Sequence, residues 1–185
     1  MNRIKKIFKK REEKIIPFIT AGFPSKSDTI DLVLAAESSG AAMVEIGMPF
    51  SDPLADGPVI QNSSRIALKN GVTIEWILDV VCKIRSRSEI PLVLMGYINP
   101  LMKYGLEKFI KDSKKSGVDG LIVPDLPPEE GKNFYNRCEA SDIDPILLVS
   151  PTTSPERLKY LSAKTRGFLY YVSLTGVTGE RAVLP

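Results

Sequence analysis

The chain has 185 residues, of which 43% are hydrophobic and 25% are charged, and its formal net charge is +3. This composition fits one globular domain over residues 1–185 and indicates no partner of the nucleic-acid class. The sequence contains no apolar run of membrane-spanning length. Histidine is absent, which excludes Ser-His-Asp and Cys-His machinery and argues against a catalytic zinc site.

The chain begins with a short basic helix followed by a β-strand. Ile4, Ile7 and Phe8 recur at helical spacing among lysines. This pattern favours an amphipathic helix that covers one end of the fold over a nucleic-acid or membrane patch. Residues 14–20 are typical of a strand, and residues 25–40 are typical of the helix after it.

The next strand ends in an acidic loop. Residues 41–47 are apolar except for Glu45, and strand alternation places Glu45 and Gly47 on the same face. An isolated buried charge is costly, so Glu45 needs either a partner or a function. The Pro- and Gly-rich loop that follows carries two more acids, Asp52 and Asp56.

The rest of the chain repeats the alternation of strand and helix. We expect helices over 61–70, 73–87, 99–117 and 128–140 and from 154 onward, and strands over 91–97, 119–124, 145–149 and 167–172. Strands that are apolar almost throughout, separated by helices, indicate a parallel sheet buried on both faces.

Two α/β architectures fit this pattern, a doubly wound sheet and a (β/α)₈ TIM barrel. The doubly wound fold would carry a glycine-rich phosphate turn after the first strand, and residues 21–24 do not form one. A barrel also explains the N-terminal helix and the acids near strand ends. We therefore favour a barrel of which this chain contains the first six β/α units plus the N-terminal helix.

Several polar residues near strand ends are candidates for a site. For Glu45, a structural ion pair and a catalytic role are equally plausible from the residues alone; burial would raise its pKa toward neutrality. Asp56 precedes a glycine and by itself favours a turn. Tyr97 and Tyr170 stand late in predicted strands, where buried aromatic residues mostly belong to the core but a phenol can also orient a substrate or a carboxylate. For Asp125, which is flanked by prolines, a structural role is favoured.

Other kinds of chemistry lack the residues that they need. No lysine stands at the carboxyl end of a predicted strand, so a Schiff-base mechanism has no nucleophile. Cys82 and Cys138 are spaced like neither a metal site nor a redox pair, and we expect reduced core thiols in a cytoplasmic protein. Carbon–carbon cleavage would have to proceed by proton transfer, on a substrate whose own ring accepts electrons.

The acidic loop carries a family resemblance. From Glu45 to Gln61 the sequence Glu-Ile-Gly-Met-Pro-Phe-Ser-Asp-Pro-Leu-Ala-Asp-Gly-Pro-Val-Ile-Gln resembles the signature of the tryptophan synthase alpha subunit family, and residues 17–24, 95–100 and 170–179 match further motifs in order and spacing. The resemblance implies a (β/α)₈ barrel that cleaves indole-3-glycerol phosphate to indole and glyceraldehyde 3-phosphate. It implies no cofactor in this chain and a beta subunit, holding pyridoxal phosphate, that receives the indole.

The resemblance also implies roles for individual residues. Glu45 would move protons at the indole C3 and the glycerol hydroxyl. Asp56 would bind the indole N–H and stabilise the developing indoleninium, with Tyr170 near the catalytic glutamate. The substrate-contacting positions of the family are matched by Phe18, Tyr97 and Gly179.

Two departures from the family pattern leave an alternative open. Leu174 replaces an arginine common in the family, and the sequence ends at Pro185, before the family's last two strands and most of its phosphate site. We therefore expect residues 1–185 alone to be much less stable than a closed barrel, insoluble or partly disordered, poor in phosphate affinity and catalytically silent. The alternative function is a truncated, non-catalytic barrel that binds or regulates a beta-type subunit.

Overall fold

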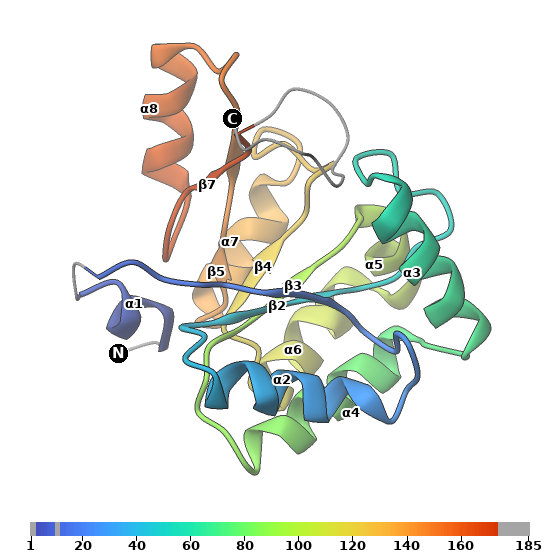
Figure 1. Ribbon diagram of the computed structural model, residues 1–185. Helices are drawn as coiled ribbons and strands as arrows, with labels where there is room; N and C mark the ends of the chain where they lie inside the picture. Colours follow the sequence, from blue (N-terminus) through green and yellow to red (C-terminus); the bar gives the residue numbers. More distant parts are fainter. Residues whose placement is uncertain (1–2, 10–11, 174–185) are drawn as a thin grey trace.

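The computed structural model describes residues 3–9 and 12–173, and its centre is a row of parallel strands (Figure 1). The first five form one sheet in the order β1-β2-β3-β4-β5: β1 (Phe18–Thr20), β2 (Val44–Gly47), β3 (Leu92–Met95), β4 (Gly120–Ile122) and β5 (Asp144–Pro145). A parallel pair, β6 (Leu148–Val149) and β7 (Tyr170–Tyr171), follows.

Strands that are neighbours in sequence are also neighbours in space. A doubly wound sheet reverses its strand order at a switch point, and the described strands show no reversal. The fold is therefore a partial barrel, as the sequence predicted. Its edges are β1 and β7, neither of which pairs with a further strand within residues 3–9 and 12–173.

Helices cover the outer side of this curved row (Figure 1). They are α2 (Asp28–Ser38), α3 (Pro58–Lys69), α4 (Ile74–Arg85), α5 (Ile98–Tyr104), α6 (Leu106–Ser116), α7 (Lys132–Ala140) and α8 (Pro155–Lys164). The short α1 (Arg3–Ile7) lies at the amino-terminal ends of the strands, which confirms the expected end-covering helix. None of the described helices is long and apolar enough to cross a membrane.

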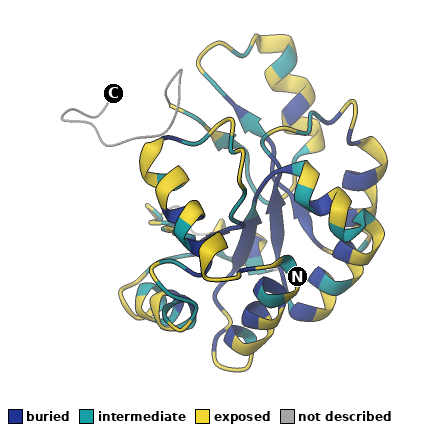
Figure 2. Ribbon diagram, turned by 90° about the vertical axis from the view of Figure 1, so that its right-hand side faces the viewer, coloured by how far each residue is buried: buried dark blue, intermediate teal, exposed yellow. Residues whose placement is uncertain are grey.

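Alternation along the strands divides the core into two layers. The larger cluster lies between the sheet and its helices and includes Ile46 and Leu94. The smaller cluster fills the inner side of the sheet, where α1 contributes Ile4 beside Met43 and Val93. The central strands β2 to β5 are accordingly buried and the edge strands β1 and β7 are partly exposed, whereas the helices expose their outer faces (Figure 2). The inner layer is the one that Glu45 faces.

Three expectations are corrected by the structure. The single strand predicted over 145–149 is divided into β5, which pairs with β4, and β6, which pairs with β7; the Ile146 amide between them still donates to the Leu121 carbonyl at 2.9 Å. The single helix predicted over 99–117 is broken at Gly105, whose φ of 96° leaves the helical region. Cys82, expected in the core, is exposed, while Cys138 is buried.

Candidate functional site

Glu45 occupies the inner face of the sheet between two strands. Its Cα pairs with those of Phe18 in β1 and Val93 in β3, and its amide donates to the Pro17 carbonyl at 3.0 Å. The side chain is 4% exposed, and burial raises its pKa to about 7. The strand pairing therefore fixes a carboxyl group that can both give and take a proton near neutral pH.

The surroundings of Glu45 separate the two interpretations left open by the sequence. Nine ion pairs join described residues, and none of them includes Glu45. Burial is the cause of its pKa shift, with no cation opposing it. A structural lysine or arginine partner is thus absent from the described part of the chain, which favours a functional carboxyl group.

Two aromatic residues lie near Glu45. The ring of Phe18 lies against Gly47, where even a Cβ would collide with it, so the glycine makes room for the ring on the inner face. Tyr170 packs against the inner cluster. Burial raises the pKa of Tyr170, and the charge of Glu45 adds to the rise. The structure thus brings Phe18 and Tyr170 to the same side of the sheet as Glu45.

Asp56 lies in the loop after β2 and is held there by Tyr97. The Tyr97 hydroxyl accepts a hydrogen bond from the Ala55 amide at 3.0 Å and is hydrogen-bonded to the Asp56 carboxylate. Burial raises the pKa of Asp56, and the bond with Tyr97 opposes that rise. Burial also raises the pKa of Tyr97 to about 12, so this phenol stays protonated and can act as the donor.

The position of Tyr97 differs from the one expected. The sequence placed it late in a strand, but β3 ends at Met95 and Tyr97 immediately precedes α5. The first residue of α5 is held by Asp125, whose carboxylate accepts a hydrogen bond from the Ile98 amide at 3.0 Å. This contact joins Asp125 to the start of α5, next to Tyr97.

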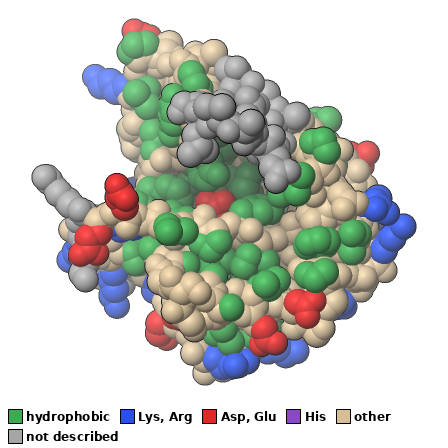
Figure 3. Space-filling view, in the orientation of Figure 1, with side chains coloured by type: hydrophobic (Ala, Val, Ile, Leu, Met, Phe, Trp, Pro, Cys, Tyr) green, Lys and Arg blue, Asp and Glu red, His purple; other side chains and the backbone are tan. Residues whose placement is uncertain are grey.

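The loop after β2 lies at the opposite end of the sheet from α1 (Figure 1). In the same orientation the molecule is hollowed, with hydrophobic side chains around the hollow and acidic atoms within it (Figure 3). The described residues contain no group of three or more acids and cysteines that could hold a metal ion. Gly179, expected to contact phosphate, lies outside the described residues, as does Leu174.

Comparisons with known proteins agree with this arrangement. The sequence model of the family "Tryptophan synthase alpha chain" matches residues 4–185. The tryptophan synthase alpha chain of Caldanaerobacter subterraneus subsp. tengcongensis is 51% identical over 98% of this chain and 70% of its own length. The tryptophan synthase alpha chain of Dehalococcoides mccartyi is 46% identical over 100% of this chain and 72% of its own length.

Solved structures give the same match. Tryptophan synthase subunit alpha from Legionella pneumophila str. Paris has a TM-score of 0.90 and 40% identity, covering 94% of this chain and 68% of that one. A tryptophan synthase complex from Pyrococcus furiosus has a TM-score of 0.82 and 41% identity, covering 85% of this chain and 65% of that one. The chain is therefore similar to these structures over nearly all of its own length and about two thirds of theirs.

Proposed function

This chain belongs to the tryptophan synthase alpha chain family, and from that premise we propose that it cleaves indole-3-glycerol phosphate to indole and glyceraldehyde 3-phosphate. The observation that carries the proposal is the buried carboxyl of Glu45, which faces the inner side of the barrel with a pKa of about 7. A carboxyl group of this kind can act as acid and as base within one reaction.

The reaction requires one proton to be given and one to be taken. Glu45 protonates the indole C3, which turns the ring into an electron acceptor. The ionised carboxylate then removes the proton of the hydroxyl group on the adjacent carbon, and the bond between that carbon and C3 breaks. The hydroxyl carbon becomes the aldehyde of glyceraldehyde 3-phosphate, the bonding electrons restore the indole, and Glu45 is protonated again.

Asp56 is assigned to the indole nitrogen. Protonation at C3 places positive charge on the ring nitrogen, and a carboxylate that accepts the N–H stabilises this charge. Tyr97 supports this role, because its hydroxyl joins Asp56 and the Ala55 amide and so holds the loop at both residues. Tyr97 is therefore proposed as a positioning residue as well as part of the pocket wall.

Three further residues complete the proposed pocket. Phe18 and Tyr170 border the inner face beside Glu45, where flat rings suit an indole. We propose Tyr170 as a catalytic residue beside Glu45, because the two side chains are close enough to interact electrostatically. Gly179 is proposed to contact the phosphate.

We propose a beta subunit as the partner that receives the indole. The loop that carries Asp56 presents Leu54 with 86% of its surface exposed, beside the proposed site. The similarity to the tryptophan synthase complex from Pyrococcus furiosus supports such a partner. The reaction needs no cofactor in this chain, since the indole ring accepts the electrons; pyridoxal phosphate is assigned to the partner. A cytoplasmic location remains a prediction.

The proposal is tested by incubating the protein with indole-3-glycerol phosphate, with and without a beta subunit, and measuring indole. We expect indole release that survives a chelator and leaves no lysine adduct after borohydride. A trapped adduct, or activity lost to the chelator and restored by zinc or magnesium, would contradict the mechanism. Complex formation without any cleavage would favour the non-catalytic binding role instead.

A further inference from the structure

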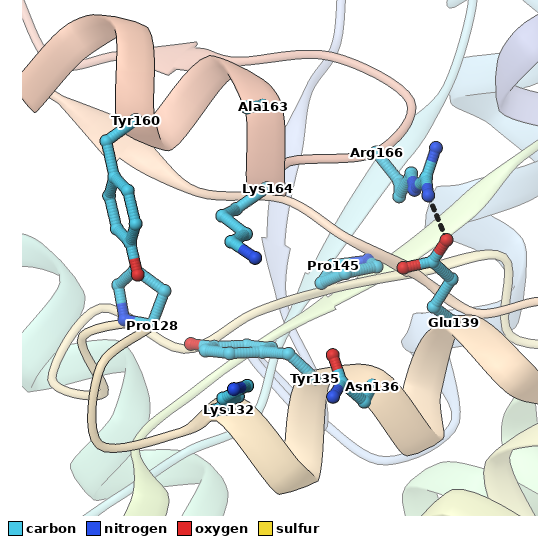
Figure 4. A pocket seen from close by; sticks show the side chains of 10 residues that line it. All are labelled: Pro128, Lys132, Tyr135, Asn136, Glu139, Pro145, Tyr160, Ala163, Lys164 and Arg166. Atoms are coloured by element: carbon cyan, nitrogen blue, oxygen red, sulfur yellow. Dashed lines mark hydrogen bonds and ion pairs between the residues drawn. The ribbon is translucent and has the colours of Figure 1, made fainter.

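A second cavity lies on the outer side of the sheet, between α7 and α8. It has a volume of about 370 Å³. Figure 4 shows that side chains of both helices border it, with Pro145 of β5 in its wall. Tyr135 at its floor belongs to the outer core cluster, so the cavity is separated by the sheet from the inner face that carries Glu45.

The cavity has aromatic and apolar walls, of which the Tyr135 side is fixed by burial and a hydrogen bond. The Tyr135 ring is buried, and its hydroxyl donates to the Leu126 carbonyl at 2.7 Å, which fixes the ring from α7. Tyr160 comes from α8 on the other side (Figure 4). Pro128 and Pro145 add two side chains with little conformational freedom. The wall made by Tyr135, Pro128 and Pro145 is therefore largely formed before any ligand arrives, whereas Tyr160 is partly exposed with Arg157 over its ring.

The charge of the cavity is unbalanced. Lys132 of α7 and Lys164 of α8 both line it, and within residues 3–9 and 12–173 neither forms an ion pair. Among the described residues that line the cavity, Glu139 has the one carboxylate, and it is already paired with Arg166 (Figure 4). Two ammonium groups from opposite helices thus remain available for an anion.

We propose that this cavity binds a small planar aromatic carboxylate. The volume lies within the range typical of small-molecule sites. A flat ring can lie between the rings of Tyr135 and Tyr160, where offset or edge contacts stabilise it. The carboxylate can then accept charge-assisted hydrogen bonds from Lys132 and Lys164. This site is separate from the proposed catalytic one and does not depend on it.

The test is the binding of 2-naphthoate to the full chain, measured by ligand-observed NMR and calorimetry. The neutral isostere 2-naphthamide removes the charge, and acetate removes the ring. We expect saturable binding of 2-naphthoate, and at least tenfold weaker binding of either analogue. Lys132→Gln and Lys164→Gln should each weaken it roughly tenfold, because each removes one hydrogen bond to a charged group.

Lys159→Gln is the matched control, since it removes a lysine of α8 that does not line the cavity. It should leave the affinity unchanged. Absence of saturable binding, equal affinity for the amide, or an affinity that Lys132→Gln and Lys164→Gln do not change would each overturn the proposal.

Discussion

Glu45 and Asp119 are both buried carboxylates of the same sheet, 4% and 5% exposed, yet their surroundings are opposite. Asp119 precedes β4 at the amino-terminal end of the sheet, where Arg85 reaches one of its oxygens at 2.7 Å and Arg3 the other at 3.1 Å. Its carboxylate also accepts the Leu92 amide at 2.9 Å. Glu45 has no such cation among the described residues, and burial leaves it with a pKa of about 7.

The arginines around Asp119 tie several segments together. Arg85 also donates to the carbonyls of Gly117, Ser88 and Ile90, at 3.0, 3.0 and 2.7 Å. Arg3 brings α1 to the same group. The contrast between Asp119 and Glu45 agrees with the general pattern of barrel enzymes, in which residues at the amino-terminal ends of the strands stabilise the fold and residues at the carboxyl-terminal ends carry out the chemistry. Asp119, whose charge is balanced by two arginines, stabilises the fold, whereas Glu45, which has no cation beside it among the described residues, can transfer a proton.

The largest expected effect is on turnover. Glu45→Gln keeps the size of the side chain but cannot exchange a proton, so indole release should fall about 10²- to 10⁴-fold while substrate still binds. Steady-state assays with binding measured separately provide the check. A variant that retained more than a tenth of wild-type turnover would remove Glu45 from the chemistry.

Whereas Glu45→Gln lowers turnover, Asp119→Asn should lower the stability of the fold. It leaves Arg85 and Arg3 without their buried counter-ion, so the free energy of unfolding should fall by about 3–5 kcal/mol. Urea denaturation gives this value. The control is Asp79→Asn, which breaks the exposed pair with Lys83 and should cost less than about 1 kcal/mol. Equal effects of the two substitutions would contradict a structural role for the buried cluster.

Stability should also depend on pH through Glu45. Its pKa is about 7 in the folded protein against an ordinary 4.5, so between these values the folded state binds more protons than the unfolded state. The contribution of Glu45 to stability is therefore greatest below about pH 4.5 and decreases until about pH 7, by about 3 kcal/mol. Relative to wild type, Glu45→Gln should gain stability over this window; a constant difference would contradict the raised pKa.

Tyr97→Phe should give the smallest effect. It removes the hydrogen bonds to Asp56 and the Ala55 amide, which should lower kcat/KM roughly tenfold. The pKa of Asp56 should rise further, because the bond that opposes its rise is lost, and the pH profile should move with it. Tyr104→Phe is the control: it loses a Tyr–Asp hydrogen bond of 2.7 Å to Asp112 of α6, which does not involve Asp56. If both variants behaved alike, Tyr97 would have no positioning role.

The sequence predicted the elements that depend on local pattern. The alternation of strand and helix gave the order of the barrel, and the period of β2 placed Glu45 on the inner face because successive strand side chains alternate. The break at Gly105 and the division after Pro145 were missed, because hydrophobic periodicity continues across both.

Contacts between distant segments could not be predicted in this way. Tyr97 is 42 residues from Ala55, and Asp119 is 34 and 116 residues from its two arginines. No local spacing relates such positions; only the parallel packing of the strands brings them together. The roles of Glu45 and Asp56 were expected from the resemblance, whereas the hydrogen bonds of Tyr97 and Asp125 became visible only in three dimensions.

The proton-carrying state of Glu45 can be measured directly. Carbon-13 NMR of protein labelled at the glutamate carboxyl carbons follows each carboxyl group through a pH titration, and Glu45→Gln identifies the resonance of Glu45. We predict one glutamate resonance that titrates near pH 7 and is missing from the variant. If the resonance that disappears in Glu45→Gln titrates at or below about 4.5 in the wild type, the carboxyl is not the poised acid–base group proposed for this barrel.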